Sequence, residues 1–271
     1  MGTESIEASF LSIFALISFF IFLLVSKYSH KIRGGVLLDK DFLKPQAFHE
    51  SPVTRSGGIA IIISLSIFFV IYNLLYDQVL YDYIFISYSV FLIGFLDDLR
   101  INIKPFRRLM IMIFLIFVFI YILPIKIFNI DVPFLTPFMS SPFLSSIFVL
   151  LCFLFVINGA NLIDGFNGLL TINLIIINSI LTYINIDNGN LEFSILLISQ
   201  IIILLSFLLF NFPNAKIFLG DSGAYTLGAI SGLNSIITNN LNPQISSFFF
   251  CTLLFYLFIE VFFSFVRKVL Q

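Results

Sequence analysis

Hydrophobic residues along this chain are gathered into about nine long runs that alternate with short polar segments. The runs cover residues 10–25, 57–76, 83–96, 109–125, 143–157, 168–186, 194–210, 224–238 and 246–265. A helix needs roughly 20 apolar residues to cross the hydrocarbon layer of a membrane, and tilt or flanking residues complete the shorter runs. The pattern predicts an all-α fold, a polytopic integral membrane bundle of about nine transmembrane helices that forms one domain over residues 1–271.

Composition supports a membrane protein and argues against a nucleic-acid partner. Of the 271 residues, 59% are hydrophobic and 11% are charged, whereas a soluble domain is about half apolar and one quarter charged. The formal net charge of −1 leaves no broad basic face for neutralising a phosphate backbone. Cys152 and Cys251 each lie in a long apolar run, which is typical of small hydrophobic residues rather than a redox pair.

Basic residues set the predicted orientation. Glu4 and Glu7 stand where a cleavable signal peptide would be basic, so we expect the first span to be retained. When the loops are numbered alternately, Lys126 is the only one of the 14 Lys and Arg residues that does not fall on one side. Because positive loops stay in the cytoplasm, we expect the N-terminus outside and the C-terminus inside.

Four polar clusters fall on the predicted cytoplasmic face. They cover residues 49–58, 94–98, 158–168 and 211–223. In the first, Arg55 offers a fork of donors for a phosphate, and Gly57 and Gly58 allow a close approach of the backbone. A basic loop that contacts lipid headgroups is the alternative. In the second, the adjacent Asp97 and Asp98 repel each other unless a cation compensates, and the alternative is a solvated pair at the membrane boundary.

The third cluster is rich in amides and glycines. Asn158, Asn161 and Asp164 follow at intervals of three residues, so a helix would present them on one side. Carboxylate and amide oxygens are hard ligands that suit Mg²⁺, whereas the alternative is a polar turn between two spans. In the fourth cluster, Asp221 lies in a Gly-Asp-Ser-Gly turn with Lys216 nearby. Such a turn can hold a cation and an anionic oxygen together, and a simple Asx turn is the alternative.

Together the four clusters favour phosphoryl transfer at the membrane surface, because that chemistry depends on positioning and on neutralising phosphate charge. The chain resembles the polyprenyl-phosphate N-acetylhexosamine-1-phosphate transferases, which are grouped as glycosyltransferase family 4. The resemblance extends from Asp41 to Lys268. Its motif residues are Asp41, His49, Pro52, Arg55, Gly57, Gly58, Asp97, Asp98, the run 158–168, the run 220–223, the run 257–260, Arg267 and Lys268.

The resemblance implies a role for each matching residue. Asp221 and Asn161 would bind Mg²⁺, which Mn²⁺ can replace. Asp97, Asp98 and Asp164 would be catalytic. His49, Arg55, Asn158, Asn167 and Lys216 would contact substrate, with Asn167 at the uridine.

The resemblance also implies the partners and the reaction. A UDP-N-acetylhexosamine would donate its sugar phosphate to undecaprenyl phosphate in the bacterial inner membrane, with the active site on the cytoplasmic face. This would be the first membrane step of O-antigen, common-antigen or related glycan synthesis, carried out by an enzyme that often forms homodimers.

Two other hypotheses stay open at this point. Family members continue into a His-containing loop and a further span that do not follow here before Gln271, so an inactive short form is one alternative. A small-solute transporter is the other, since ionisable groups within spans mark transporters. Only Glu260 lies clearly inside a run, whereas the other acids gather at one face, and this favours the enzyme.

Overall fold

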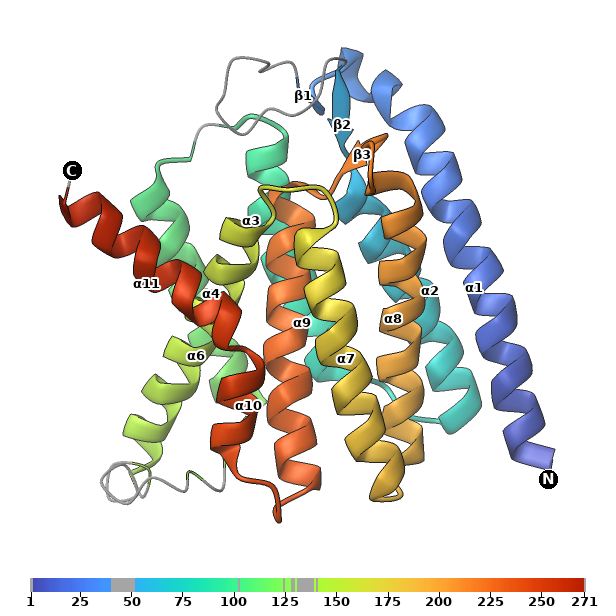
Figure 1. The fold of residues 1–271 in the computed structure, drawn as a ribbon, viewed down its shortest axis with the longest axis vertical. Coiled ribbons are helices and arrows are strands. Elements are labelled where there is room, and N and C mark those ends of the chain that lie inside the picture. The colour runs from blue at the N-terminus through green and yellow to red at the C-terminus, as the bar shows by residue number, and fades with distance from the viewer. Residues whose placement is uncertain are drawn as a thin grey trace.

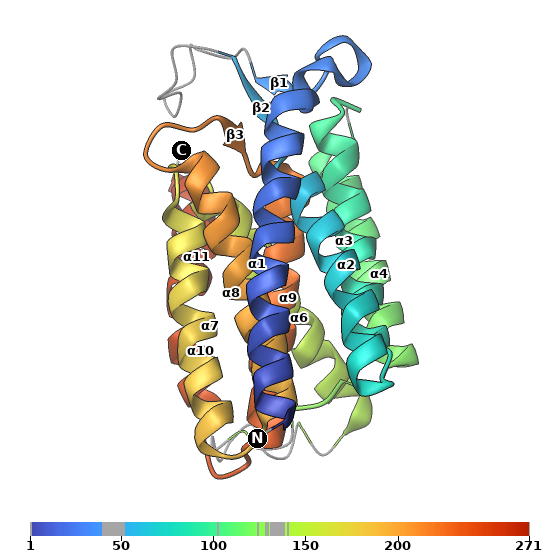
Figure 2. The same cartoon turned by 90° about the vertical axis from the view of Figure 1, so that its right-hand side faces the viewer.

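The computed structural model describes residues 2–39, 52–101, 103–123, 125–127, 130, 139 and 141–270 of the chain. The described α-helices are α1 (Gly2–Tyr28), α2 (Gly57–Tyr76), α3 (Tyr81–Asp98), α4 (Pro105–Ile122), α6 (Pro142–Ile163), α7 (Leu169–Asp187), α8 (Leu191–Asn211), α9 (Gly220–Leu241), α10 (Ser247–Leu253) and α11 (Phe255–Leu270). The long helices lie side by side along the longest axis of the molecule (Figures 1 and 2). The N-terminus lies at one end of this bundle, and the chain runs toward the other end as it reaches its C-terminus (Figure 1).

Each of the nine predicted apolar runs overlaps a described helix, but fewer than nine of these helices are long and apolar enough to span a membrane. By length and composition, six of the described helices are long and apolar enough, and a seventh span forms if α10 and α11, bent by 63° at their junction, count as one. The helix α3 carries Asp82, Asp97 and Asp98 within its 18 residues. The predicted number of about nine spans and the orientation of the termini therefore stay predictions, whereas the helical membrane bundle is confirmed.

The helix α9 is polar because protein rather than lipid surrounds it. It packs against α2, α3, α6 and α7, and nearly all of its residues from Ser222 to Asn239 are buried. Small residues in membrane helices let neighbouring backbones come close. At Gly228, for example, an added Cβ would lie 2.8 Å from the Cβ of Ala160. A helix enclosed in this way needs no apolar surface, which explains why its sequence is less hydrophobic than that of its neighbours.

A small sheet, which the hydropathy pattern did not predict, lies above one end of the bundle. The strand β2 (Val53–Arg55) pairs antiparallel with β1 (Leu38–Asp39) and parallel with β3 (Ile217–Phe218). Leu38 faces Thr54, and Thr54 faces Ile217. The sheet thus ties the segment before α2 to the segment before α9, so that residues far apart in the sequence meet at the same end of the bundle.

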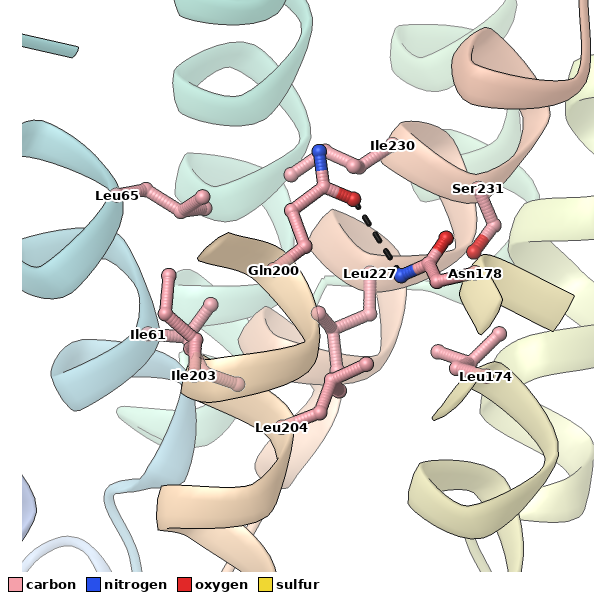
Figure 3. A pocket seen from close by; sticks show the side chains of 10 residues that line it. All are labelled: Ile61, Leu65, Leu174, Asn178, Gln200, Ile203, Leu204, Leu227, Ile230 and Ser231. Atoms are coloured by element: carbon pink, nitrogen blue, oxygen red, sulfur yellow. Dashed lines mark hydrogen bonds between the residues drawn. The ribbon is translucent and has the colours of Figure 1, made fainter. Parts of the chain in front are cut away.

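Amide side chains form a buried network halfway along the helices. The Tyr83 hydroxyl donates to Asn234 Oδ1 (2.7 Å), and Asn234 Nδ2 donates to Gln200 Oε1 (2.6 Å) and to Asn178 Oδ1 (3.1 Å). Asn178 Nδ2 also donates to Gln200 Oε1 (3.5 Å), and both side chains line a narrow cavity of about 10 Å³ (Figure 3). Because an unpaired amide is costly in an apolar interior, these four residues join α3, α7, α8 and α9 in one relative arrangement.

Candidate active site

Three aspartates converge where α3 ends and α9 begins. Asp97 and Asp98 are the last residues of α3, and Asp221 lies in the first turn of α9. The two helices approach closely at Gly94, where an added Cβ would collide with the backbone of Asp221 and Ser222. We call this end of the bundle, which also carries the small sheet, the acidic end. The sequence prediction that Asp97, Asp98 and Asp221 meet at one end of the bundle is confirmed.

Asp98 binds the start of α9 rather than facing open space. Its carboxylate accepts hydrogen bonds from the backbone N–H of Asp221 (2.9 Å), the backbone N–H of Ser222 (3.0 Å) and the Ser222 hydroxyl (2.5 Å). The first N–H groups of a helix have no partner within the helix, and a carboxylate there is also favoured by the helix dipole. Gly220, with φ of 77°, leaves room for this carboxylate, since an added Cβ would lie 2.7 Å from Asp98 Oδ2. Asp98 thereby fixes the position of Asp221.

Arg108 joins the other two carboxylates. It lies in the first turn of α4, donates from Nη1 to Asp97 Oδ2, and lies 3.3 Å from Asp221 Oδ2. Its guanidinium carbon is 5.6 Å from the centre of the Tyr225 ring, one helical turn beyond Asp221. All three charged side chains keep some solvent access, with exposed fractions of 27% for Arg108, 15% for Asp97 and 26% for Asp221. The group is therefore open to a ligand from the acidic end.

A second ion pair lies on the sheet beside this group. Arg55, on β2, donates from Nη2 (2.7 Å) and Nε (3.1 Å) to one oxygen of Asp39 on β1. Burial disfavours the charge of Arg55, but Asp39, Asp98 and Asp221 together offset this effect and raise its pKa. The guanidinium is thus held near the acids, and it has a partner in Asp39 that the sequence did not reveal.

The two glycines that follow Arg55 serve packing within the protein. Gly58 donates its N–H to the Leu219 carbonyl (2.9 Å). An added Cβ at Gly58 would overlap the hydroxyl of Ser222 and the backbone of Gly223. The close approach expected for Gly57 and Gly58 occurs, and its partner is the start of α9.

The amide-rich cluster lies next to the acids, with its residues in different settings. Asn158 and Asn161 are on α6, and Asp164 caps the end of that helix. Asn158 Nδ2 donates to the Leu154 carbonyl of its own helix (2.7 Å), whereas Asn161 shares a side-chain hydrogen bond with Tyr225. Half-buried Asp164 has a pKa raised by burial and by the charges of Asp221 and Asp98. Asp164 therefore belongs to the same electrostatic site.

The remaining predicted contacts lie farther out. Asn167 Nδ2 donates to the Pro213 carbonyl (2.9 Å), which links the α6–α7 turn to the loop before β3. Lys216 is exposed in that loop. His49 lies outside the described residues. The roles of Asn158, Asn167, Lys216 and His49 in binding substrate stay predictions.

Crowded negative charge characterises the site. Burial raises the pKa of Asp98 to about 6, although the N–H and O–H groups that it accepts favour its charged form. Burial also raises the pKa of Asp221, while Arg108 lowers it. Five carboxylates, those of Asp39, Asp97, Asp98, Asp164 and Asp221, thus share the charge of Arg108 and Arg55, and a site of this kind attracts a further cation.

The carboxylate oxygens that remain available as metal ligands are of the kind that Mg²⁺ binds. Among the described residues, no group of three or more His, Cys, Asp and Glu side chains is arranged to hold a metal ion. Mg²⁺, however, usually binds one or two carboxylates, keeps several waters and takes further oxygens from substrate phosphates. Asp97 and Asp221 converge on one cation, Arg108, and their oxygens are of the right kind. Asp98 does not fit this role, since the start of α9 occupies its oxygens.

Sequence reasoning missed Arg108, Asp39 and Tyr225 as site residues. Arg108 counted only as one of several loop cations, and Asp39 preceded the clusters of interest. The position of Arg108 in the last polar residues before an apolar run on the same face as Asp97 was the available signal. Tyr225 carried none, because an aromatic residue one turn into a membrane helix is ordinary.

Known proteins resemble this chain over most of its length. The family model described as glycosyl transferase family 4 matches residues 79–239. A phospho-N-acetylmuramoyl-pentapeptide-transferase of Streptococcus agalactiae is 35% identical over 161 residues, which are 54% of this chain and 45% of that relative. An undecaprenyl-phosphate alpha-N-acetylglucosaminyl 1-phosphate transferase of Thermotoga maritima is 26% identical over 255 residues, 94% of this chain and 72% of the relative. The match thus spans less than half the length of the streptococcal protein.

Proposed function

Because this chain belongs to glycosyl transferase family 4, we propose that it transfers an N-acetylhexosamine-1-phosphate from a UDP-sugar to undecaprenyl phosphate and releases UMP. The observation that carries the proposal is the meeting of Asp97 and Asp221 at Arg108, at the end of a membrane bundle. The names of the relatives from Streptococcus agalactiae and Thermotoga maritima support the same class of reaction. The product would begin the synthesis of a cell-envelope glycan.

The reaction joins a phosphate oxygen of the acceptor to the β-phosphorus of the donor, and the bond from that phosphorus to the UMP oxygen breaks. A phosphomonoester has its second pKa near 6, so the acceptor is largely a dianion at neutral pH and needs little help from a base. Asp97, at 15% exposed, orients the acceptor and takes its residual proton. The larger requirement is to hold two anionic substrates together.

Positive groups of the chain meet that requirement. Arg108 reaches Asp97 and Asp221 from α4, so it lies where a phosphate between the two acids would bind. Arg55 is held near the same acids on the sheet, where Nε and Nη2 bind Asp39, and Nη1 would be the donor that faces a phosphate. Such fixed charges stabilise the transition state without reorganising during the reaction.

Asp221 and Asp97 would hold Mg²⁺, with Asn161 the further ligand expected from the family resemblance. The ion supplies charge neutralisation at the phosphate oxygens when it is bound. Asp98 keeps Asp221 in place through the hydrogen bonds at the start of α9. Nucleotide sugars are cytosolic, so we place the acidic end at the cytoplasmic face of a bacterial inner membrane.

Substitution of Asp221 tests the proposal. Membranes that contain the protein are incubated with radiolabelled UDP-GlcNAc, Mg²⁺ and polyprenyl phosphate, and chloroform-soluble label is counted. Asp221→Ala should lower turnover at least about a hundredfold, whereas Asp187→Ala, an exposed acid at the other end of the bundle, should leave it unchanged. Turnover by Asp221→Ala at the level of the unaltered protein, or no labelled lipid from the unaltered protein with any labelled UDP-N-acetylhexosamine, would overturn the assignment. A transporter would produce no such label with any variant.

A further inference from the structure

Tyr225 contacts two groups of the candidate active site with different parts of its side chain. Arg108 lies over its ring, with the guanidinium carbon 5.6 Å from the ring centre. Its hydroxyl shares a hydrogen bond with the side chain of Asn161. Because Arg108 is on α4 and Asn161 is on α6, this one side chain of α9 connects three helices at the acidic end.

Packing holds Tyr225 in place. The residue is 1% exposed, and it follows Asp221 by four residues on α9, so both side chains lie on the same face of that helix. The helices α6 and α9 come close one turn farther along, where an added Cβ at Gly228 would lie 2.8 Å from the Cβ of Ala160. Ala160 is the chain neighbour of Asn161. The backbones that carry Asn161 and Tyr225 are therefore fixed relative to each other.

The hydrogen bond with Tyr225 determines which atom of Asn161 a ligand can reach. A side-chain amide donates from Nδ2 and accepts at Oδ1, whereas a tyrosine hydroxyl does both. When Nδ2 donates to the hydroxyl, Oδ1 is turned away from Tyr225 and stays available as a ligand for a hard cation. When the hydroxyl donates to Oδ1 instead, the N–H groups of the amide are left to face a ligand, and they repel a cation. The hydroxyl of Tyr225 thus controls the orientation of the amide.

The ring of Tyr225 holds Arg108 by a different interaction. Arg108 has a long side chain with an exposed fraction of 27%, and ordering such a side chain costs conformational entropy. The face of an aromatic ring attracts a guanidinium group. The ring therefore favours the rotamer in which Arg108 reaches Asp97 and Asp221. An aliphatic residue of similar size would not provide this preference.

We propose that Tyr225 is a positioning residue, whose hydroxyl accepts from Asn161 Nδ2 and leaves Asn161 Oδ1 for a divalent cation, and whose ring keeps Arg108 at the two acids. The inference rests on the proposed function, in which Asp97 and Asp221 would hold Mg²⁺ beside a phosphate. An outer partner that orients a metal ligand typically changes metal affinity by about 10–100-fold. The alternative is an ordinary core tyrosine, since a buried hydroxyl needs some partner. Variants that remove the hydroxyl and the ring separately distinguish the two.

Two substitutions of Tyr225 test the proposal. Tyr225→Phe removes the hydroxyl and keeps the ring, whereas Tyr225→Leu removes both. Binding of Mn²⁺ alone to the detergent-solubilised protein is measured by electron paramagnetic resonance, and turnover in the radiolabelled lipid assay is followed against Mg²⁺ concentration. In Tyr225→Phe the Mn²⁺ affinity should fall about tenfold, and the Mg²⁺ concentration for half-maximal turnover should rise equally, with maximal turnover nearly unchanged. In Tyr225→Leu maximal turnover should also fall, by roughly three- to tenfold, because Arg108 loses its support.

Tyr83→Phe is the matched control. Tyr83 is also 1% exposed, and its hydroxyl donates to Asn234 Oδ1 (2.7 Å) in the middle of the bundle. The control therefore removes the same kind of buried hydrogen bond between a phenol and an amide, but its Mn²⁺ affinity should match that of the unaltered protein. Equal Mn²⁺ affinities in Tyr225→Phe and Tyr83→Phe would overturn the proposal, as would a lack of Mn²⁺ binding to the unaltered protein. If Tyr225→Leu does not yield folded protein, Tyr225→Met fills more of the same space.

A second position separates the orientation of the amide from the packing of the site. Asn161→Asp replaces the amide with a carboxylate, which presents an oxygen in either orientation. In the Asn161→Asp protein, the further change Tyr225→Phe should leave Mn²⁺ affinity unchanged. An equal loss of affinity in this background would show that Tyr225 supports packing alone, and would overturn the proposal. If Tyr225→Phe weakens Mn²⁺ binding but the unaltered protein makes no labelled lipid, the transfer reaction is wrong and the orientation of Asn161 by Tyr225 stands.

Discussion

Polar side chains gather at both ends of α9, but they are charged at one end and neutral at the other. At the acidic end, Asp221 and Asp97 share one cation, Arg108, and Asp98 accepts hydrogen bonds from the start of the helix. At the other end, neutral amides bind one another: Asn242 Nδ2 donates to Asn185 Oδ1 (3.2 Å), and Asn185 Nδ2 donates to Thr238 (3.0 Å). We call this second group, with Asn190, the amide end.

The difference lies in the chemistry of the side chains. An amide both donates and accepts, so a cluster of amides satisfies itself, whereas an ionised carboxylate only accepts. The acids at the acidic end consequently need positive groups from elsewhere, and the described residues supply Arg108 and Arg55. A self-satisfied cluster fixes the helices in place, and a cluster that lacks positive charge is ready to bind a cation or a substrate that carries one. We therefore expect the amide end to contribute stability and the acidic end to contribute the proposed chemistry.

Removal of Arg108 should have the largest effect among the variants that test this difference between the two ends of α9. Arg108→Ala leaves Asp97 and Asp221 without their shared cation, and the fixed charge that would face a phosphate is lost. We expect turnover in the radiolabelled lipid assay to fall by about 10²–10³, the effect of removing one transition-state donor. The melting temperature in detergent should change little, because the side chain is partly solvated.

Arg107→Ala is the control for this prediction, since Arg107 is the exposed neighbour of Arg108 on the same helix turn. Its turnover should match that of the unaltered protein. Loss of turnover in both variants would mean that general positive charge at this face, and not the bridge between two acids, supports the reaction. Full turnover in Arg108→Ala would remove Arg108 from the site.

The sequence predicts part of this site, because polar residues in a membrane protein gather at the ends of the helices. Charged residues avoid the hydrocarbon layer, so the apolar runs and the clusters between them placed Asp97, Asp98 and Asp221 at one end correctly. The runs also marked the helices. No pattern showed that Asp98 would cap α9 while its neighbour Asp97 would face Arg108, because that depends on how α3 and α9 pack at Gly94.

The small sheet was beyond prediction for a related reason. Strands of two or three residues, such as β1 and β2, are too short for an alternating pattern. Their pairing is what brings Asp39 to Arg55. The enclosed position of α9, in contrast, is visible in the sequence. A helix surrounded by protein needs no apolar surface, so the hydropathy of α9 is lower than that of its neighbours.

An amide-end variant should show the reverse of the Arg108 result. Asn185 is fully buried, and Asn185→Leu would leave the Thr238 hydroxyl without its Asn185 donor and would remove one of the two acceptors of Asn242 Nδ2, which keeps the Thr238 carbonyl. Buried polar groups without partners cost about 1–3 kcal/mol, which would lower the melting temperature by roughly 2–10 °C for a chain of this size. The specific activity of the folded fraction should stay the same.

Asn188→Leu is the comparison for that variant, because Asn188 is an exposed amide near the end of the same helix. Its melting temperature should shift by less than that of Asn185→Leu. If Asn185→Leu instead lowered specific activity without a change in melting temperature, the amide end would have a part in the reaction and the division between the two ends of α9 would be wrong.

The smallest effect concerns backbone strain, which occurs at both ends. Asp77 (φ 49°) and Arg100 (φ 57°) are the non-glycine residues with positive φ in the described chain. Asp77 ends α2 at the same end as the amides, whereas Arg100 follows α3 at the acidic end and donates from Nη2 to the Leu38 carbonyl (2.8 Å). Glycine adopts positive φ without strain, so replacement should relieve both sites. Only at Arg100 does the replacement also release β1, the strand that carries Asp39.

We therefore expect Asp77→Gly to raise the melting temperature slightly, by an amount equivalent to about 0.5 kcal/mol, with unchanged turnover. In Arg100→Gly the lost hydrogen bond, worth about 0.5–1.5 kcal/mol, offsets the relief. Turnover should fall severalfold, because Asp39 and its partner Arg55 lose a support. If Arg100→Gly relieves the backbone strain but lowers turnover, the strained conformation of Arg100 contributes to the reaction. An Arg100→Gly variant as stable and as active as Asp77→Gly would show that the two strained residues are equivalent, and that the hydrogen bond to Leu38 holds nothing that the reaction needs.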